Sequence, residues 1–293
     1  MKTGIKTSSP ATISLDGALN NILFFALNHP RVEIVLKTTD KTSSFSLYGY
    51  KAYKLSFIEN AIDYIFSLEI IKQSPQVELE ITNRIPFQSG LGAHSSFFAA
   101  LLKAMCTINK INLNNRELYK LIISTKNKFI EDINLGRLLT SLEGGSMFVD
   151  DTSPELCHRI YLPSGILWII YRSKLPISSD HINKLNPKAS IAKSLKLILG
   201  LHDGKWELIE QGFINTVNNI SLLNFTDKEN NSLKENCLGV DFIAENNLFL
   251  FCCNNSLKAD LSYEILSKHF GTKQQNKEVL LHSGIDFAGT IKL

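Results

Sequence analysis

Polar and apolar residues alternate along several stretches of the chain, most regularly in residues 31–37 and 77–81. This period of two is typical of a strand that buries one face. The apolar run at 248–253 is continuous, which indicates a strand buried on both faces. With shorter stretches included, the predicted strands are residues 12–15, 31–37, 45–48, 77–81, 159–162, 166–171, 248–253 and 279–282, with a turn and a further strand in 143–150.

Other stretches carry apolar residues at helical spacing, as residues 56–68 do with Phe57, Ile58, Ala61 and Ile62 on one face. The predicted helices are residues 56–68, 94–105, 114–131, 189–201, 206–223 and 259–270, with a short one at 233–239. We predict a loop or a short helix for residues 134–141.

Strands and helices occur together in both halves of the chain, so the predicted fold class is α+β. Residues 176–187 are polar and typical of a loop, which makes them the best candidate for a boundary. We therefore expect an N-terminal lobe of residues 1–175 and a C-terminal lobe of residues 176–293.

A glycine loop joins the strand at 77–81 to the helix that begins near His94, and it contains Pro86, Gly90 and Gly92. The first amides of a helix lack partners inside it, and the helix dipole adds partial positive charge there. Glycines let further amides converge on one point, so this join is a candidate cradle for a phosphate or a carboxylate.

Side chains around this loop could add donors to such a cradle. Ser89, Ser95 and Ser96 offer hydroxyls, and His94 offers a titratable ring. The alternative is that the serines only cap the helix. The loop is neither a Walker A loop, since no Gly-Lys-Ser/Thr follows, nor a dinucleotide fingerprint, since the third glycine is missing.

Composition restricts the class of protein further. With 293 residues, 44% of them hydrophobic, the chain can bury one large core or two, and its net charge of +3 gives no sign of a nucleic acid or membrane partner. Its five cysteines form no CxxC pair, which fits reduced thiols better than a disulfide framework or a zinc site. No apolar stretch reaches the roughly 20 residues that span a bilayer. We therefore expect a cytoplasmic protein with a small-molecule substrate, and we leave a homodimer open.

The loop sequence Pro-Phe-Gln-Ser-Gly-Leu-Gly at 86–92 resembles the second motif of the GHMP superfamily, which includes galactokinase, homoserine kinase and mevalonate kinase. Residues 8–15 look like the opening strand of that family, and residues 284–293 look like the closing segment of homoserine kinase. The resemblance implies a two-lobed fold, with an N-terminal lobe like ribosomal protein S5 domain 2 and a ferredoxin-like C-terminal lobe. It also implies that a phosphate of the co-substrate is bound by Ser89, Gly90, Leu91, Gly92, Ala93, Ser95 and Ser96.

Two relatives within that superfamily compete. Residues 26–34 and 142–150 are similar to runs in β-ribofuranosylaminobenzene 5′-phosphate synthase, which transfers a phosphoribosyl group from phosphoribosyl pyrophosphate. Homoserine kinase, which uses ATP, aligns through residues 114–131 and the Gly144-Gly145 turn. Our main prediction is a phosphoribosyltransferase, with an ATP-dependent kinase or a catalytically degenerate binding protein as alternatives.

The resemblance also suggests roles for individual residues. Glu143 and Asp150 are candidates for binding Mg²⁺ or for acid–base catalysis, since the two glycines between them could bring both to one site. Arg137 could clamp a phosphate, Asp16 could contact a substrate hydroxyl, and His94 could donate to an anion. The alternatives are a solvated surface residue for Glu143, Arg137 and Asp16, an Asp that ends a strand for Asp150, and for His94 a ring packed on Phe97 or Phe98.

The chain also departs from the kinase pattern in three places. Ala93-His94 stands where the kinases have Ser-Ser, and Lys126 where a metal-binding Glu is expected. Residues 239–247, where the glycine-rich loop of the third superfamily motif is expected, contain one glycine, so their backbone would approach a phosphate less closely.

Overall fold

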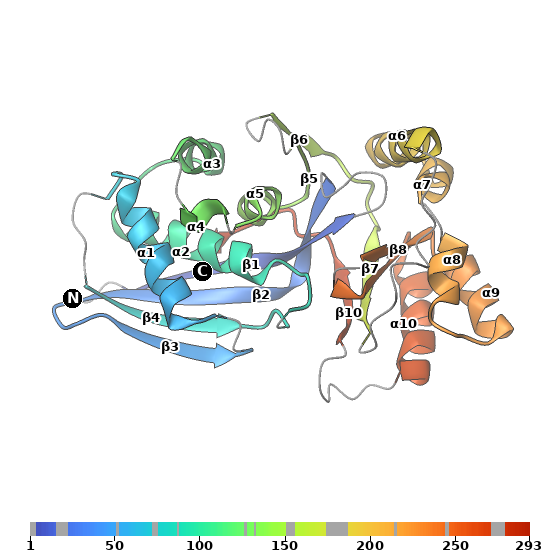
Figure 1. The fold of residues 1–293 in the computed structure, drawn as a ribbon, viewed down its shortest axis with the longest axis horizontal. Coiled ribbons are helices and arrows are strands. Elements are labelled where there is room, and N and C mark those ends of the chain that lie inside the picture. The colour runs from blue at the N-terminus through green and yellow to red at the C-terminus, as the bar shows by residue number, and fades with distance from the viewer. Residues whose placement is uncertain are drawn as a thin grey trace. The chain divides into compact units, whose positions relative to one another are not determined.

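The chain divides into two compact units (Figure 1). In this computed structural model the described residues are 4–15, 23–50, 53–71, 76–86, 88–125, 128–131, 133–150, 156–173, 187–213, 216–243, 246–270 and 279–293. Unit 1 comprises residues 1–13, 24–158 and 286–293, and unit 2 comprises residues 14–23 and 159–285. The units do not coincide with the expected lobes of residues 1–175 and 176–293, because residues 14–23 and 159–175 group with unit 2 and residues 286–293 group with unit 1.

The sheet of unit 1 is mixed and has the strand order β11-β1-β2-β4-β3, with β5 paired to β2 and β6 paired to β5. Its strands are β1 (Gly4–Leu15), β2 (Leu23–Thr39), β3 (Ser44–Gly49), β4 (Gln76–Asn83), β5 (Ser146–Val149), β6 (Cys157–Ile160) and β11 (Ile291–Lys292). β2 and β4 are antiparallel, with Ile34 opposite Ile81. The alternation seen in the sequence follows from this sheet, since Val77, Leu79 and Ile81 are buried on one face.

The helices of unit 1 cover one face of that sheet (Figure 1). They are α1 (Leu55–Ser67), α2 (Ala93–Ile108), α3 (Asn115–Ser124), α4 (Lys128–Glu131) and α5 (Leu135–Glu143). α2 is apolar around most of its circumference and is the central helix of the layer, with Phe97, Phe98 and Leu101 fully buried. Its buried side chains anchor the glycine loop that precedes it.

The single helix predicted for residues 114–131 is wrong, because α3 ends at Ser124 and α4 is a separate short helix. The hydroxyls of Ser124 and Thr125 both donate to the Leu121 carbonyl, at 2.8 and 3.0 Å. That carbonyl would otherwise accept the Thr125 amide, which bonds to Ile122 instead. Side-chain competition of this kind ends a helix even where the apolar spacing continues.

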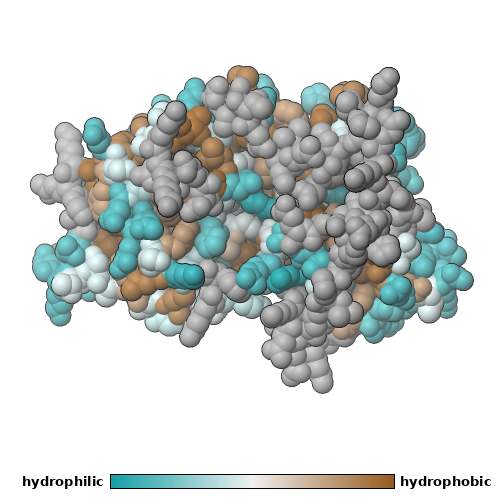
Figure 2. Space-filling model, in the orientation of Figure 1, coloured by the Kyte–Doolittle hydropathy of each residue, from teal (hydrophilic) through white to brown (hydrophobic). Residues whose placement is uncertain are grey.

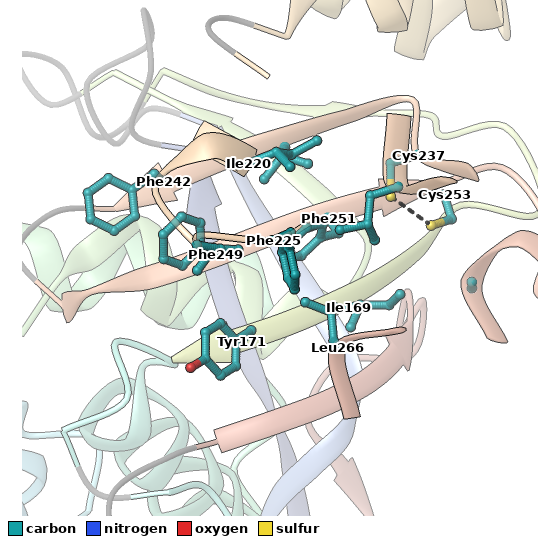
Figure 3. Close-up of a cluster of buried hydrophobic side chains, with 14 residues drawn as sticks. Ile169, Tyr171, Ile220, Phe225, Cys237, Phe242, Phe249, Phe251, Cys253 and Leu266 are labelled. Atoms are coloured by element: carbon teal, nitrogen blue, oxygen red, sulfur yellow. Dashed lines mark hydrogen bonds between the residues drawn. The ribbon is translucent and has the colours of Figure 1, made fainter. Parts of the chain in front are cut away.

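The sheet of unit 2 has the order β10-β7-β9-β8, and every pairing in it is antiparallel. Its strands are β7 (Leu167–Arg172), β8 (Gly239–Ile243), β9 (Leu248–Cys253) and β10 (Val279–Gly284), and its helices are α6 (Pro187–Asp203), α7 (Trp206–Gly212), α8 (Thr216–Ser221), α9 (Asp227–Asn236) and α10 (Ser256–Phe270). The core joins side chains of the sheet, such as Ile169 and Phe251, to Leu266 of α10 (Figure 3). Cys237 and Cys253 lie in it with their sulfur atoms 3.8 Å apart.

The single helix predicted for residues 206–223 is also wrong, because α7 and α8 are separate. Phe213 ends α7 in an extended conformation, with φ −68° and ψ 127°. Its ring packs edge-on against Trp168 of β7, with the ring centres 6.3 Å apart. A tertiary contact therefore breaks a helix that the sequence pattern would continue.

Residues 286–293 close unit 1 rather than unit 2. Arg31 of β2 forms an ion pair with Asp286, and it also donates to the Ser8 hydroxyl at 2.8 Å and to the Gly289 carbonyl at 2.9 Å. Asp286 in turn accepts the amides of Ala288 and Gly289 at 2.8 and 2.7 Å. The segment is thus clamped to β1 and β2 by a buried charge pair with hydrogen-bonded partners.

The surface view in Figure 2 shows hydrophilic and hydrophobic residues interspersed, in keeping with the small net charge of +3. Within the described ranges, none of the helices has the length and apolar character needed to cross a bilayer.

Candidate functional site

The loop between β4 and α2 is fixed at its start by Asn83, the last residue of β4. The Asn83 amide group donates to the carbonyls of Tyr50 and Ile85, at 3.0 and 3.1 Å. Its carbonyl oxygen accepts the Ile85 amide at 3.0 Å. Further along, the Thr12 amide of β1 donates to the Leu91 carbonyl at 3.0 Å. The loop is therefore fixed at its start by contacts with the residue that follows β3, and near its end by a hydrogen bond from β1.

The N-terminus of α2 opens on this loop without a side-chain cap. Its N-cap residue is Gly92, in the left-handed conformation with φ 70°, and the first helical bond runs from the Ser96 amide to the Gly92 carbonyl at 2.9 Å. The amides of Ala93 and Ser95 precede that bond and so lack a partner inside the helix. Together with the helix dipole they favour an anion at this point.

A second helix N-terminus lies beside the first. Asn134 caps α5 by accepting the Arg137 amide at 2.9 Å. The Asn134 carbonyl in turn accepts the Ser95 hydroxyl at 3.3 Å, which ties the starts of α5 and α2 together. Both dipoles therefore contribute positive potential to the same place.

A cavity of about 230 Å³ lies in front of these two helix starts, lined by residues 88–95 with Pro86, Asn134 and Arg137. Of the predicted site residues it thus brings together Ser89, Gly90, Leu91, Gly92, Ala93, His94, Ser95 and Arg137. Among the described residues that line it none is acidic, and Arg137 carries the permanent charge. The cavity has the size and sign of charge for a phosphate group.

Arg137 lies directly against Gly92. A Cβ atom added at Gly92 would lie 3.3 Å from Arg137 Cδ and 2.4 Å from Thr12 Oγ1. The Arg137 guanidinium donates through Nη1 to the Thr12 carbonyl at 2.6 Å. Thr12 Oγ1 is buried and has no hydrogen-bond partner within the described part of the chain. Both the positive φ and the close approach of Thr12 require glycine at position 92.

His94 lines the cavity and also packs on aromatic side chains. Its ring centre lies 4.4 Å from that of Phe57 and 5.8 Å from that of Tyr53. Tyr53 donates through its hydroxyl to the Ala93 carbonyl at 3.0 Å, and burial raises the pKa of Tyr53 well above its usual value. The ring of His94 therefore packs on aromatic residues of the segment that precedes β4.

The three loop serines use their hydroxyls within the protein. Ser89 donates to the Pro86 carbonyl at 2.7 Å, Ser95 to Asn134, and Ser96 to the Pro10 carbonyl at 2.6 Å. Ser96 is fully buried and does not line the cavity. These hydroxyls fix the loop, and none of them caps α2.

Glu143 and Asp150 lie at the far end of α5 and after β5, and neither lines the cavity. Arg116 holds Glu143, with its Nε 3.8 Å from a carboxylate oxygen, and also donates to the Cys157 carbonyl at 3.1 Å. Within the described ranges, no cluster of three or more His, Cys, Asp or Glu side chains could hold a metal ion. Among the described residues that line the cavity, none offers the carboxylate oxygens that Mg²⁺ prefers.

The glycine turn between Glu143 and Asp150 has a different use. The Gly145 carbonyl accepts the Ala26 amide at 2.8 Å, and the Thr290 amide donates to the Leu142 carbonyl at 3.2 Å. Residues 286–290 therefore pack against this turn. A Cβ atom at Gly144 would lie 2.4 Å from the Gly289 nitrogen, so this packing accounts for a glycine at position 144. Asp16 and Lys126 lie outside the described residues, as do residues 244 and 245 of the glycine-poor loop.

Sequence reasoning missed Asn134, Gln88 and Pro86 as cavity residues. For Asn134 a signal was present, because an Asn directly before Leu135, Leu138 and Leu139 is a typical helix N-cap. Gln88 gave none, since its left-handed conformation, with φ 54°, is unusual for a residue other than glycine.

Comparison with known proteins agrees with this geometry. Residues 56–138, which contain the loop and all the described residues that line the cavity, match the family model "GHMP kinases N terminal domain". No curated protein matches the sequence.

Solved structures of similar fold cover nearly the whole chain. A homoserine kinase from Cytophaga hutchinsonii has a TM-score of 0.77 at 18% identity, covering 100% of this chain and 98% of its own. A putative homoserine kinase from Listeria monocytogenes has a TM-score of 0.70 at 14% identity, covering 99% of both chains. A mevalonate kinase from Staphylococcus aureus has a TM-score of 0.65 at 12% identity, covering 98% of this chain and 99% of its own. The predicted α+β fold of this type is confirmed, and the match of residues 56–138 to the family model agrees with the resemblance to the GHMP kinase superfamily.

Proposed function

We propose that the protein is a kinase-like transferase that moves a phosphoryl group from ATP to a small metabolite. The observation that carries the proposal is the cavity at the uncapped start of α2, where helix amides and Arg137 surround a space of about 230 Å³. Similar structures are homoserine and mevalonate kinases, so the comparisons favour the kinase alternative over the phosphoribosyltransferase that was our main prediction. Phosphoribosyl pyrophosphate has no comparable support.

The residues of the cavity have distinct tasks in this proposal. The amides at the start of α2 bind the phosphate oxygens, because they lack partners inside the helix and lie at the positive end of its dipole. Arg137 neutralises the phosphate charge, and its bond to the Thr12 carbonyl holds the guanidinium against Gly92. Phosphoryl transfer depends mainly on positioning and on electrostatic stabilisation, which are the two things this arrangement supplies.

A ligand panel tests the proposal. ATP at a hundred times its Kd should stabilise the folded chain by about 2.7 kcal/mol, which is readily seen as a rise in melting temperature. An assay of ADP formation, with homoserine and mevalonate among the hydroxylated acceptors, then tests transfer. A response to phosphoribosyl pyrophosphate without one to ATP would restore the phosphoribosyltransferase, and a folded protein that answers to neither would point to a non-catalytic relative.

A further inference from the structure

Three polar side chains meet in the interior of unit 2, away from the phosphate cavity. Cys237 is the C-cap residue of α9, and Cys253 is the last residue of β9. Their Sγ atoms lie 3.8 Å apart and point toward one another (Figure 3). The hydroxyl of Ser262 of α10 lies 3.4 Å from Cys237 Sγ. All three side chains are buried, and both cysteines are free thiols.

The neighbouring Cys252 does not share this place. Successive side chains of a strand point to opposite faces of the sheet, so Cys252 faces away from Cys253. Phe251 and Cys253, which flank it, face the core cluster together with Cys237. Cys106 and Cys157 belong to unit 1. Of the five cysteines, all of which the structure describes, the fold therefore brings Cys237 and Cys253 together as a pair.

We propose that Cys237 and Cys253 form a redox-active dithiol site, which a peroxide converts to a disulfide inside unit 2 and a thiol reductant restores. An S–S bond of about 2.05 Å requires the two sulfur atoms to approach by about 1.8 Å, which rotation of the two side chains can supply. The proposal goes beyond the proposed function and does not depend on it, since the cavity belongs to unit 1.

The oxidation has two steps. Cys237 is 7% exposed and Cys253 is 0% exposed, so the peroxide reaches Cys237 first. The Cys237 sulfur takes one oxygen atom from hydrogen peroxide and becomes a sulfenic acid, and a water molecule leaves. The Cys253 sulfur then attacks the Cys237 sulfur, the S–O bond breaks, and a second water leaves with the proton of the Cys253 thiol. Two thiols and one peroxide thus give one disulfide and two waters.

The surroundings of the pair set the rate of this reaction. The hydrogen bond with Cys237, and after it burial, raises the pKa of Cys253 above its usual value. Since the thiolate is the attacking form, the disulfide forms slowly at neutral pH and faster as the pH rises. Ser262 is a polar neighbour in an otherwise apolar core, and its hydroxyl can donate to the oxygen of the sulfenic acid.

Oxidation of the full-length native protein tests the proposal. The protein is treated with hydrogen peroxide at about pH 8, excess peroxide is removed with catalase, and the remaining thiols are blocked with iodoacetamide in urea. Peptide mapping should find Cys237 linked to Cys253, with the loss of two hydrogen atoms, and dithiothreitol should release the link. The link joins residues 16 positions apart, so it should raise the melting temperature of unit 2 by several degrees.

Cys252→Ser is the matched control, because Cys252 is adjacent in sequence, is also buried and faces the other side of the sheet. This variant should form the Cys237–Cys253 link as the unaltered protein does. Cys237→Ser should lose both the linked peptide and the rise in melting temperature. A melting curve before oxidation shows that each variant is folded, and Cys253→Ser serves if Cys237→Ser does not fold.

Three results would overturn the proposal. One is a native protein in which Cys237 and Cys253 both still react with iodoacetamide after treatment with peroxide. Another is a link between Cys252 and Cys253, which would show that chain neighbours pair instead. The third is Cys237 oxidised to a sulfinic acid without a link, which would show that the Cys253 sulfur does not reach it. None of the three bears on ATP binding, so the proposed function stands or falls separately.

Discussion

Replacing Gly92 by alanine tests the architecture of the loop most directly. The residue has φ 70°, and the added methyl group would lie 2.4 Å from Thr12 Oγ1 and 3.3 Å from Arg137 Cδ. Two separate penalties follow. One is the left-handed conformation of a residue with a Cβ, and the other is a collision with buried atoms that have little room to move.

The two penalties can be estimated separately. A left-handed conformation costs a non-glycine residue about 1–2 kcal/mol. Overpacking a close-packed site costs about 1–3 kcal/mol. Gly92→Ala should therefore lower the free energy of unfolding by about 2–5 kcal/mol, a large part of the roughly 5–15 kcal/mol typical of a folded protein.

Gly204→Ala is the matched control, because Gly204 has φ 68° and its Cβ would meet only Pro163, at an ordinary 3.7 Å. It should cost the conformational part alone, about 1–2 kcal/mol. Urea denaturation measures both, with circular dichroism for the whole chain and fluorescence for unit 2, which contains Trp168 and Trp206. The double variant Thr12→Ala with Gly92→Ala should recover the steric part, since it removes the hydroxyl in the way. If Gly92→Ala costs no more than Gly204→Ala, the close approach of Thr12 is refuted.

Four further measurements probe other parts of the molecule. Asp286→Asn should destabilise unit 1 by about 3–5 kcal/mol, because it leaves the charge of Arg31 buried without its partner; an unchanged urea midpoint would contradict this. Asn134→Ala should cost about 1 kcal/mol through the lost cap of α5, while Asn134→Asp should keep the cap and weaken tripolyphosphate binding, which calorimetry would reveal. Burial raises the pKa of Tyr64 to about 12, so its neutral form stabilises the fold below pH 10 and that contribution is lost as the pH rises from 10 towards 12; Tyr64→Phe should flatten this part of the stability profile. Burial also raises the pKa of Cys106 to about 11, so iodoacetamide at pH 8 should label that thiol only after unfolding; peptide mapping separates it from the half-buried Cys157, and labelling of Cys106 in the native protein would argue against the packing of α2.

The spacing of apolar residues correctly predicted those strands and helices whose buried face follows from the local sequence. β4 and α2 were recognised because their periods of two and 3.6 reflect the faces they bury. The helix break at Thr125 was missed because apolar spacing does not register hydroxyls that compete for the Leu121 carbonyl. The break at Phe213 was missed because it depends on Trp168, which is distant in the sequence.

The candidate site shows the same division. Loop residues and Arg137 were proposed from the sequence, and the structure gathers most of them around one cavity. The turn after Glu143 was interpreted as a metal site because two carboxylates flank two glycines. In the structure the Gly145 amide donates to the Asp286 carbonyl, and no spacing within residues 142–150 could reveal a partner so far along the chain. The two runs that resemble the phosphoribosyl synthase, residues 26–34 and 142–150, contact each other at this turn through the Ala26 amide and the Gly145 carbonyl.

The clamp between Arg31 and Asp286 has a consequence for how the protein is made. β1 leaves the ribosome long before its partner β11 and before the acceptor for Arg31, because both lie more than 250 residues further along the chain. Thr290 adds bonds to Ser9 and to the Ser141 carbonyl, at 2.9 and 2.8 Å. Although domains usually fold in the order of their synthesis, unit 1 must wait for residues 286–293, with all of unit 2 translated in between. A nascent chain stalled before Asp286 would expose an incomplete sheet edge, and is the state in which chaperones should hold this protein.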